Sequence, residues 1–90
     1  MLRIILFLVS PEVELKLEKK HWVSVAEIES VGRNDPIFVR DRDLYSMLGR
    51  TDDGRYLFVF VRYLGRNTAR VITAHEMTDR EKDAFRRLKG

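Results

Sequence analysis

The chain has 90 residues, of which 44% are hydrophobic and 34% are charged, a balance that indicates a folded globular protein and excludes disordered and fibrous classes. The absence of cysteine excludes a disulfide scaffold and a cysteine zinc site, and two histidines are too few for a histidine-rich metal centre. We therefore expect no metal and no cofactor. This length suits one small core, so residues 1–90 are predicted to form a single domain.

The net charge of +3 is concentrated in the middle of the chain and comes from arginine. Residues 37–75 hold seven arginines and four aspartates, whereas residues 1–36 carry a net charge of −1 and residues 76–90 a net charge of +1. Because the arginine guanidinium is a planar fork of donors, it matches phosphate oxygens better than lysine does. This excess indicates a nucleic-acid partner, although a solvated sheet surface explains it as well.

The first element is an apolar run from Leu2 to Val9, which predicts a buried strand. The run is too short for a membrane span and lacks a cleavage site for export, so we expect a cytoplasmic protein without membrane association. Ser10 before Pro11 is a helix start, since serine caps well and proline is tolerated at the first helical position. A short amphipathic helix over residues 11–20 follows.

Two further helices are predicted from capping boxes, in which the side chains of a first and a fourth residue cap each other's backbone. Ser24 and Glu27 begin a helix that ends near Gly32. Thr78 and Glu81 begin the last helix, whose apolar side includes Phe85. Both starts have the right spacing, and the glycine is typical of a helix end.

Between the second and third helices, hydrophobic residues recur with the period of two that is typical of strands. The strands are predicted at residues 37–43, 44–50, 55–64 and 68–75, with turns at Asp41–Asp43, Asp52–Gly54 and Gly65–Asn67. The order is therefore one strand, two helices, four meandering strands and a helix. This order predicts an α+β domain with an antiparallel sheet whose helices cover one face.

Arginines and aromatic residues alternate with aliphatic residues along the predicted strands. Tyr56, Phe58, Phe60 and Arg62 should face one way, and Arg55, Leu57, Val59, Val61 and Tyr63 the other. The pattern does not decide which side packs under the helices. Arginine beside an aromatic ring suits phosphate binding and base stacking, so Arg62 and Arg70 are candidate contacts to a nucleic-acid backbone. Ordinary cross-strand packing is the competing interpretation.

His75 is the candidate for proton transfer, because imidazole titrates near neutrality and this residue ends a strand close to a helix start. Glu76 follows it directly and would orient or tune the ring. A histidine that merely bonds a nearby carbonyl is the competing interpretation. For His21, at a predicted helix end, the structural interpretation is favoured. Known triads, phosphate-binding glycine loops and metal motifs are absent from the sequence.

Several segments, taken in order, resemble the BrnT-type toxins of bacterial toxin–antitoxin pairs. The resemblance covers residues 20–87 and is carried by Lys20-His21-Trp22-Val23-Ser24, Asn34-Asp35-Pro36, Leu48-Gly49-Arg50-Thr51, Gly54-Arg55-Tyr56-Leu57-Phe58-Val59, Arg70-Val71-Ile72-Thr73-Ala74-His75 and Thr78-Asp79-Arg80-Glu81. The chain departs from the family pattern at Trp22, where glycine is usual, and at His75, where arginine is usual.

The resemblance implies a RelE-like fold, an RNA-cleaving activity and a cognate antitoxin as partner. By position it implies that Arg50 and His75 lie in the active region. The expected function is a metal-independent ribonuclease toxin of a type II toxin–antitoxin pair, which cleaves mRNA or ribosome-associated RNA by arginine-assisted attack of the 2′-OH. In this scheme Arg50 clamps the scissile phosphate and His75 moves the proton. The alternative is a catalytically inactive member that binds RNA or a protein.

Overall fold

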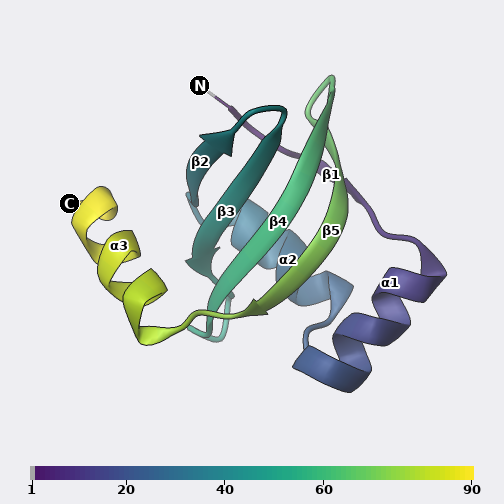
Figure 1. Ribbon diagram of the computed structural model, residues 1–90, viewed down its shortest axis with the longest axis horizontal. Helices are drawn as coiled ribbons and strands as arrows, with labels where there is room; N and C mark the ends of the chain where they lie inside the picture. Colours follow the sequence, from purple (N-terminus) through teal and green to yellow (C-terminus); the bar gives the residue numbers. More distant parts are fainter. Residues whose placement is uncertain (1) are drawn as a thin grey trace.

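The computed structural model describes residues 2–90 and contains a five-stranded sheet with helices on both of its faces (Figure 1). The strand order across the sheet is β1-β5-β4-β3-β2. The elements in chain order are β1 (Leu6–Leu8), α1 (Pro11–Lys16), the π-helix η1 (Leu17–His21), α2 (Val25–Arg33), β2 (Ile37–Asp41), β3 (Leu44–Arg50), β4 (Tyr56–Gly65), β5 (Thr68–Glu76) and α3 (Asp79–Lys89).

The sheet is mixed, which corrects the prediction of an antiparallel sheet. β2, β3, β4 and β5 form the expected antiparallel meander, but β1 pairs in parallel with β5, with Leu6 opposite Thr68. Consecutive antiparallel strands are joined by tight turns, whereas β1 is separated from β2 by three helical segments. A parallel pair of strands needs a long connection between its two members. The helices and strands between β1 and β5 supply that length, so β1 can pair in parallel with β5 at the edge of the sheet.

The helix α2 lies across one face of the sheet and η1 packs beside it against β5, and this face holds the main core, while α1 lies beyond the β5 edge (Figure 1). Alternation along β4 sends Leu57, Val59 and Val61 into that core, where all three are fully buried. Their partners in the core come mainly from α2, η1 and the other strands: Ile4, Phe7, Leu17, Val23, Ile28, Val31, Met47, Ala69, Val71 and Ala74. The side of β4 that carries Tyr56, Phe58, Phe60 and Arg62 is therefore the open face of the sheet.

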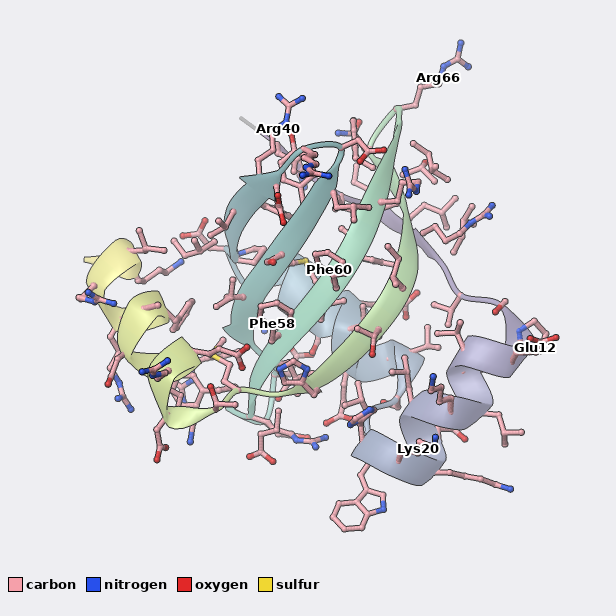
Figure 2. The ribbon with its side chains drawn as sticks, viewed as in Figure 1. Glu12, Lys20, Arg40, Phe58, Phe60 and Arg66 are labelled. Carbon is pink, nitrogen blue, oxygen red and sulfur yellow. The ribbon has the colours of Figure 1, made fainter. Side chains whose placement is uncertain are left out.

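The C-terminal helix α3 packs on the opposite side from α2 and covers one end of the open face, which corrects the prediction that the helices cover a single face. Its buried Phe85 forms a second cluster with Leu48 and Met77, and Tyr56 and Phe58 pack against this cluster. Tyr56 meets the Phe85 ring edge-on, with ring centroids 6.0 Å apart. Because α3 stops there, Phe60 lies on the uncovered part of β4, beyond Phe58 at the edge of this cluster (Figure 2).

The predicted caps are confirmed, but the first helix is irregular. Ser10, Ser24 and Thr78 all accept a backbone N–H at a helix start. The helix predicted over residues 11–20 changes from α to π geometry after Lys16 and ends at Trp22, which adopts a left-handed conformation with φ 52°. Within residues 2–90, every helix is too short or too polar to span a bilayer.

Candidate active site

His75 lies on the open face near the end of β5, directly opposite Phe58 of β4. The imidazole stacks on the Phe58 ring, with centroids 4.8 Å apart and an angle of 13° between the planes. Its Nε2 atom lies 3.0 Å from Oε1 and 3.3 Å from Oε2 of Glu81. The ring is half-buried, so it is held by two neighbours and remains accessible from solvent.

Glu81, and not Glu76, is the carboxylate beside His75, which corrects the expectation from sequence. Glu76 follows His75 on the strand and so points to the other side, where its carboxylate lies 3.8 Å from the guanidinium of Arg55. Glu81 belongs to the first turn of α3, and its carboxylate also accepts the backbone N–H of Thr78 at 2.9 Å. The capping box thus holds the carboxylate at the strand end.

His21, interpreted from sequence as structural, lies next to His75. Its ring centroid is 6.4 Å from that of His75, with 52° between the ring planes. It reaches this position from the end of η1, which packs against β5. Two imidazoles and one carboxylate therefore meet at one end of the sheet. Among residues 2–90, no three histidine, cysteine or acidic side chains are grouped so that they could hold a metal ion.

Of the predicted site arginines, Arg50 lies nearest to His75. It belongs to a cationic cluster around Tyr56. It lies at the end of β3 opposite Tyr56, with its guanidinium carbon 4.9 Å from the ring centroid. Lys82 and Arg86 of α3 approach the same ring at 5.6 Å and 5.7 Å. Arg50 and His75 flank β4 on either side, opposite Tyr56 and Phe58, which places them about 12 Å apart across two strand spacings and two residues. The two predicted catalytic residues therefore share one end of the open face.

Arg62 and Arg70 lie on the same face but at its other end. They are opposite each other in the β4–β5 register, four or five residues along the strands from the Phe58–His75 pair. At about 3.3 Å per residue, this separation is about 13 Å or more. Arg62 also forms an ion pair with Asp43. They extend the positive charge of the open face and do not contribute to the His75 end.

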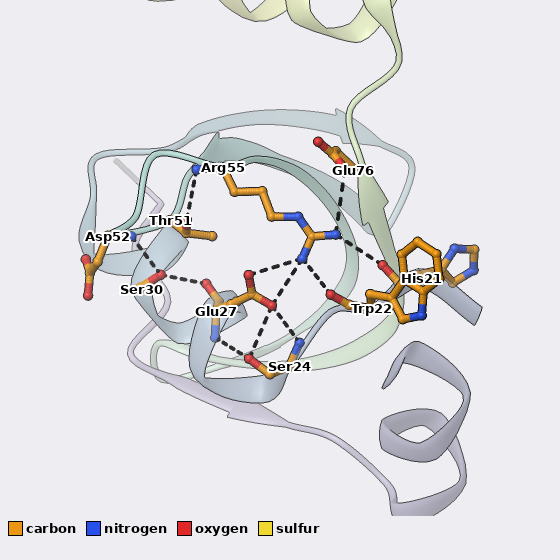
Figure 3. Close-up of polar contacts among 9 residues, drawn as sticks. All are labelled: His21, Trp22, Ser24, Glu27, Ser30, Thr51, Asp52, Arg55 and Glu76. Carbon is orange, nitrogen blue, oxygen red and sulfur yellow. Dashed lines mark hydrogen bonds and ion pairs between the residues drawn. The ribbon is translucent and has the colours of Figure 1, made fainter. Parts of the chain in front are cut away.

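Arg55 serves a structural purpose on the helix-covered side (Figure 3). Its guanidinium donates to the backbone carbonyls of His21 at 3.2 Å and Trp22 at 2.5 Å, and to the Glu27 carboxylate at 3.1 Å and 3.2 Å. The pKa of Glu27 is lowered: burial acts to raise it, but the Ser24 backbone N–H and the Arg55 guanidinium together outweigh that effect. This contact fixes the end of η1 against β4 and α2.

The residues that the sequence analysis did not assign to the site are Glu81, His21, Tyr56, Phe58, Lys82 and Arg86. Glu81 had a usable signal, because a capping-box glutamate turns back toward the residues before its helix. His21 had none, since only the packing of η1 against β5 brings it to His75. Lys82 and Arg86 are four residues apart, which places them on one side of a helix, but the direction of that side depends on how α3 packs.

By sequence, no family model and no curated protein matches the chain. By structure, it is similar to the ribonuclease toxin BrnT of Brucella abortus, with a TM-score of 0.63. The match covers 88% of this chain and 100% of that one, at 14% sequence identity. The mixed five-stranded sheet and its helices are therefore a BrnT-like fold.

Proposed function

We propose that this 90-residue chain is a single-domain, cytoplasmic ribonuclease toxin of a type II toxin–antitoxin pair, related to the RelE-like enzymes. The observation that carries the proposal is the His75–Glu81 pair. The His75 ring stacks on Phe58, and the cationic cluster of Arg50, Lys82 and Arg86 lies at the same end of the open face of a BrnT-like fold. Proton transfer and phosphate binding are thus available at one end of one surface.

The proposed reaction is cleavage of RNA by its own 2′-OH and needs no metal. The 2′-oxygen forms a bond to phosphorus, the bond from phosphorus to the 5′-oxygen breaks, and a cyclic phosphate and a 5′-hydroxyl result. In this scheme His75 takes the 2′-OH proton while Glu81 orients its ring, and His21, whose ring lies 6.4 Å from that of His75, returns a proton to the leaving oxygen. Arg50 stabilises the charge that develops on the phosphate oxygens.

The direct test is cleavage of a single-stranded RNA by His75 variants. His75→Ala should lower the rate by about 10²–10⁴-fold, the usual contribution of a positioned proton-transfer group. His75→Arg should also be slow if the proton matters, because arginine stays charged at neutral pH, and it should retain activity if only charge matters. Circular dichroism checks the fold, and EDTA should leave the rate unchanged. Full activity of the alanine variant would remove His75 from the mechanism.

Arg62 and Arg70 are proposed to contact the RNA backbone away from the cleavage point. Their contribution is electrostatic, so binding should weaken steeply with salt, since each neutralised phosphate releases counterions. The double variant Arg62→Ala/Arg70→Ala should bind more weakly and show a shallower slope of log affinity against log salt. A slope equal to that of wild type would show that RNA does not reach this end of the face.

A cognate antitoxin is the proposed protein partner, with an acidic or amphipathic segment over the arginine-bearing open face. Leu8, opposite Arg70 in the β1–β5 register, and the neighbouring Ile72 add exposed apolar area to this face, which suits a protein contact. Co-expression with the product of the adjacent gene should restore growth and yield a complex. If the pair associates but the chain never cleaves RNA, the alternative holds: an inactive member that binds RNA or protein.

A further inference from the structure

We propose that the indole of Trp22 is a stacking platform for a nucleobase of bound single-stranded RNA. Trp22 is the only tryptophan in the chain and is 79% exposed, more than any other exposed large hydrophobic residue among residues 2–90. An indole left in water gives up the burial that normally stabilises a fold. Such exposure is typical of a side chain that meets a ligand.

The backbone at Trp22 is left-handed and ends η1, one of five positive-φ positions outside glycine among residues 2–90. Its φ of 52° and ψ of 43° are left-handed, a conformation that costs a residue with a side chain about 1–2 kcal/mol. The preceding π-helix is a second irregular feature at the same point. Strained residues and π-turns cluster at functional sites, where the surrounding structure holds them in place.

Hydrogen bonds from a neighbouring side chain anchor the backbone at Trp22. Arg55 binds the carbonyl oxygens of both His21 and Trp22, and Glu27 anchors the other side of the same guanidinium (Figure 3). The backbone that carries the indole is therefore fixed before any ligand arrives. A fixed backbone loses little conformational entropy on binding, which favours affinity.

The surroundings of Trp22 favour RNA over a protein partner. Lys19 and Lys20 precede it in the last turn of η1, so the segment that carries the platform is basic, and cations attract phosphates. His21, the adjacent residue, places its ring 6.4 Å from that of His75. A strand with its scissile phosphate at His75 and His21 would therefore continue past Trp22. Every base has a π-face, so the stack would tolerate different sequences.

This inference rests on the proposed ribonuclease function and is tested separately from it. The probe is a single-stranded RNA with a 2′-O-methyl group at every position, which cannot be cleaved. Because Trp22 is the sole indole, its fluorescence reports directly on stacking, and it should be quenched saturably as this RNA binds. Anisotropy of a labelled copy should show affinity weakened about 5- to 100-fold in Trp22→Gly, the scale of one base stack.

The controls separate stacking from folding. Trp22→Gly should melt no lower than wild type, because glycine accepts the left-handed backbone. Trp22→Phe should keep most of the affinity, and Leu15→Ala, at an exposed apolar position of α1, should bind like wild type.

Unquenched fluorescence with unchanged affinity of Trp22→Gly would overturn the inference while cleavage by wild type stands. Quenching by the antitoxin and not by RNA would also overturn it, in favour of a protein contact. Absence of both binding and cleavage in wild type would overturn the proposed function and this inference together.

Discussion

At the scale of single residues, Glu81 joins a helix start to the candidate catalytic ring. Its carboxylate accepts the Thr78 backbone N–H at 2.9 Å and meets His75 Nε2 at 3.0 Å. The geometry that caps α3 is therefore the geometry that orients the imidazole. We expect Glu81 to act through His75 as a positioning residue, with no contact to the RNA.

Glu81→Gln separates these two contributions. Glutamine also completes a capping box, so the melting temperature should stay close to that of wild type. The lost carboxylate should lower kcat with little change in KM, and by less than the 10²–10⁴-fold expected for His75→Ala. Glu76→Gln is the matched control, because Glu76 follows His75 in sequence but faces Arg55. Equal losses in both variants would contradict the assignment.

At the scale of elements, the close approach of α2 to β3 depends on Gly49. A Cβ at this position would lie 2.9 Å from Val31 Cγ1 and 3.2 Å from Cβ of Pro36. Gly49 is buried on the helix-covered side of β3, directly before Arg50 on the open face. The packing of α2 and the placement of Arg50 are therefore set by the same short stretch of strand.

Gly49→Ala should destabilise the protein by about 1–3 kcal/mol, the usual cost of overpacking a close contact. Urea unfolding followed by circular dichroism measures this as a lower midpoint at a similar slope. Ser46→Ala is the matched control, since Ser46 is only half-buried on the open face of the same strand. A midpoint for Gly49→Ala equal to that of the control would show that α2 and Val31 can shift at no cost.

At the scale of the whole molecule, the Arg55–Glu27 contact ties together segments that are distant in sequence. The guanidinium of Arg55, the residue before β4, reaches the C-terminal end of η1, the first turn of α2 and, at 3.8 Å, Glu76 of β5. Both side chains are largely buried, with 22% exposure for Arg55 and 29% for Glu27. Removing one partner leaves the other charge without its compensation.

This contact predicts how stability depends on pH. The pKa of Glu27 in the folded state is below its ordinary value of 4.5, so the unfolded state binds the proton more tightly. The stabilisation by Glu27 is then fully present above about pH 5 and is lost as the pH falls through the lowered pKa. The free energy of unfolding of Glu27→Gln should therefore lie furthest below that of wild type near neutrality, with a gap that narrows in acid. Glu29→Gln, at an exposed position of the same helix, is the control. A difference in unfolding free energy between Glu27→Gln and wild type that stays constant with pH would contradict the prediction.

The sequence by itself determined the local structure, because caps, turns and hydrophobic periods act over a few residues. Ser10, Ser24 and Thr78 begin their helices as predicted, and the last four strands alternate and turn as predicted. The tertiary structure alone decided the parallel pairing of β1, the choice of open face, and the meeting of His75 with Glu81 and His21. Strand pairing across three helical segments and side-chain contacts between β5, α3 and η1 are long-range. These long-range contacts form because the assembled elements bury the most apolar area when those faces meet. No short window of sequence contains that information.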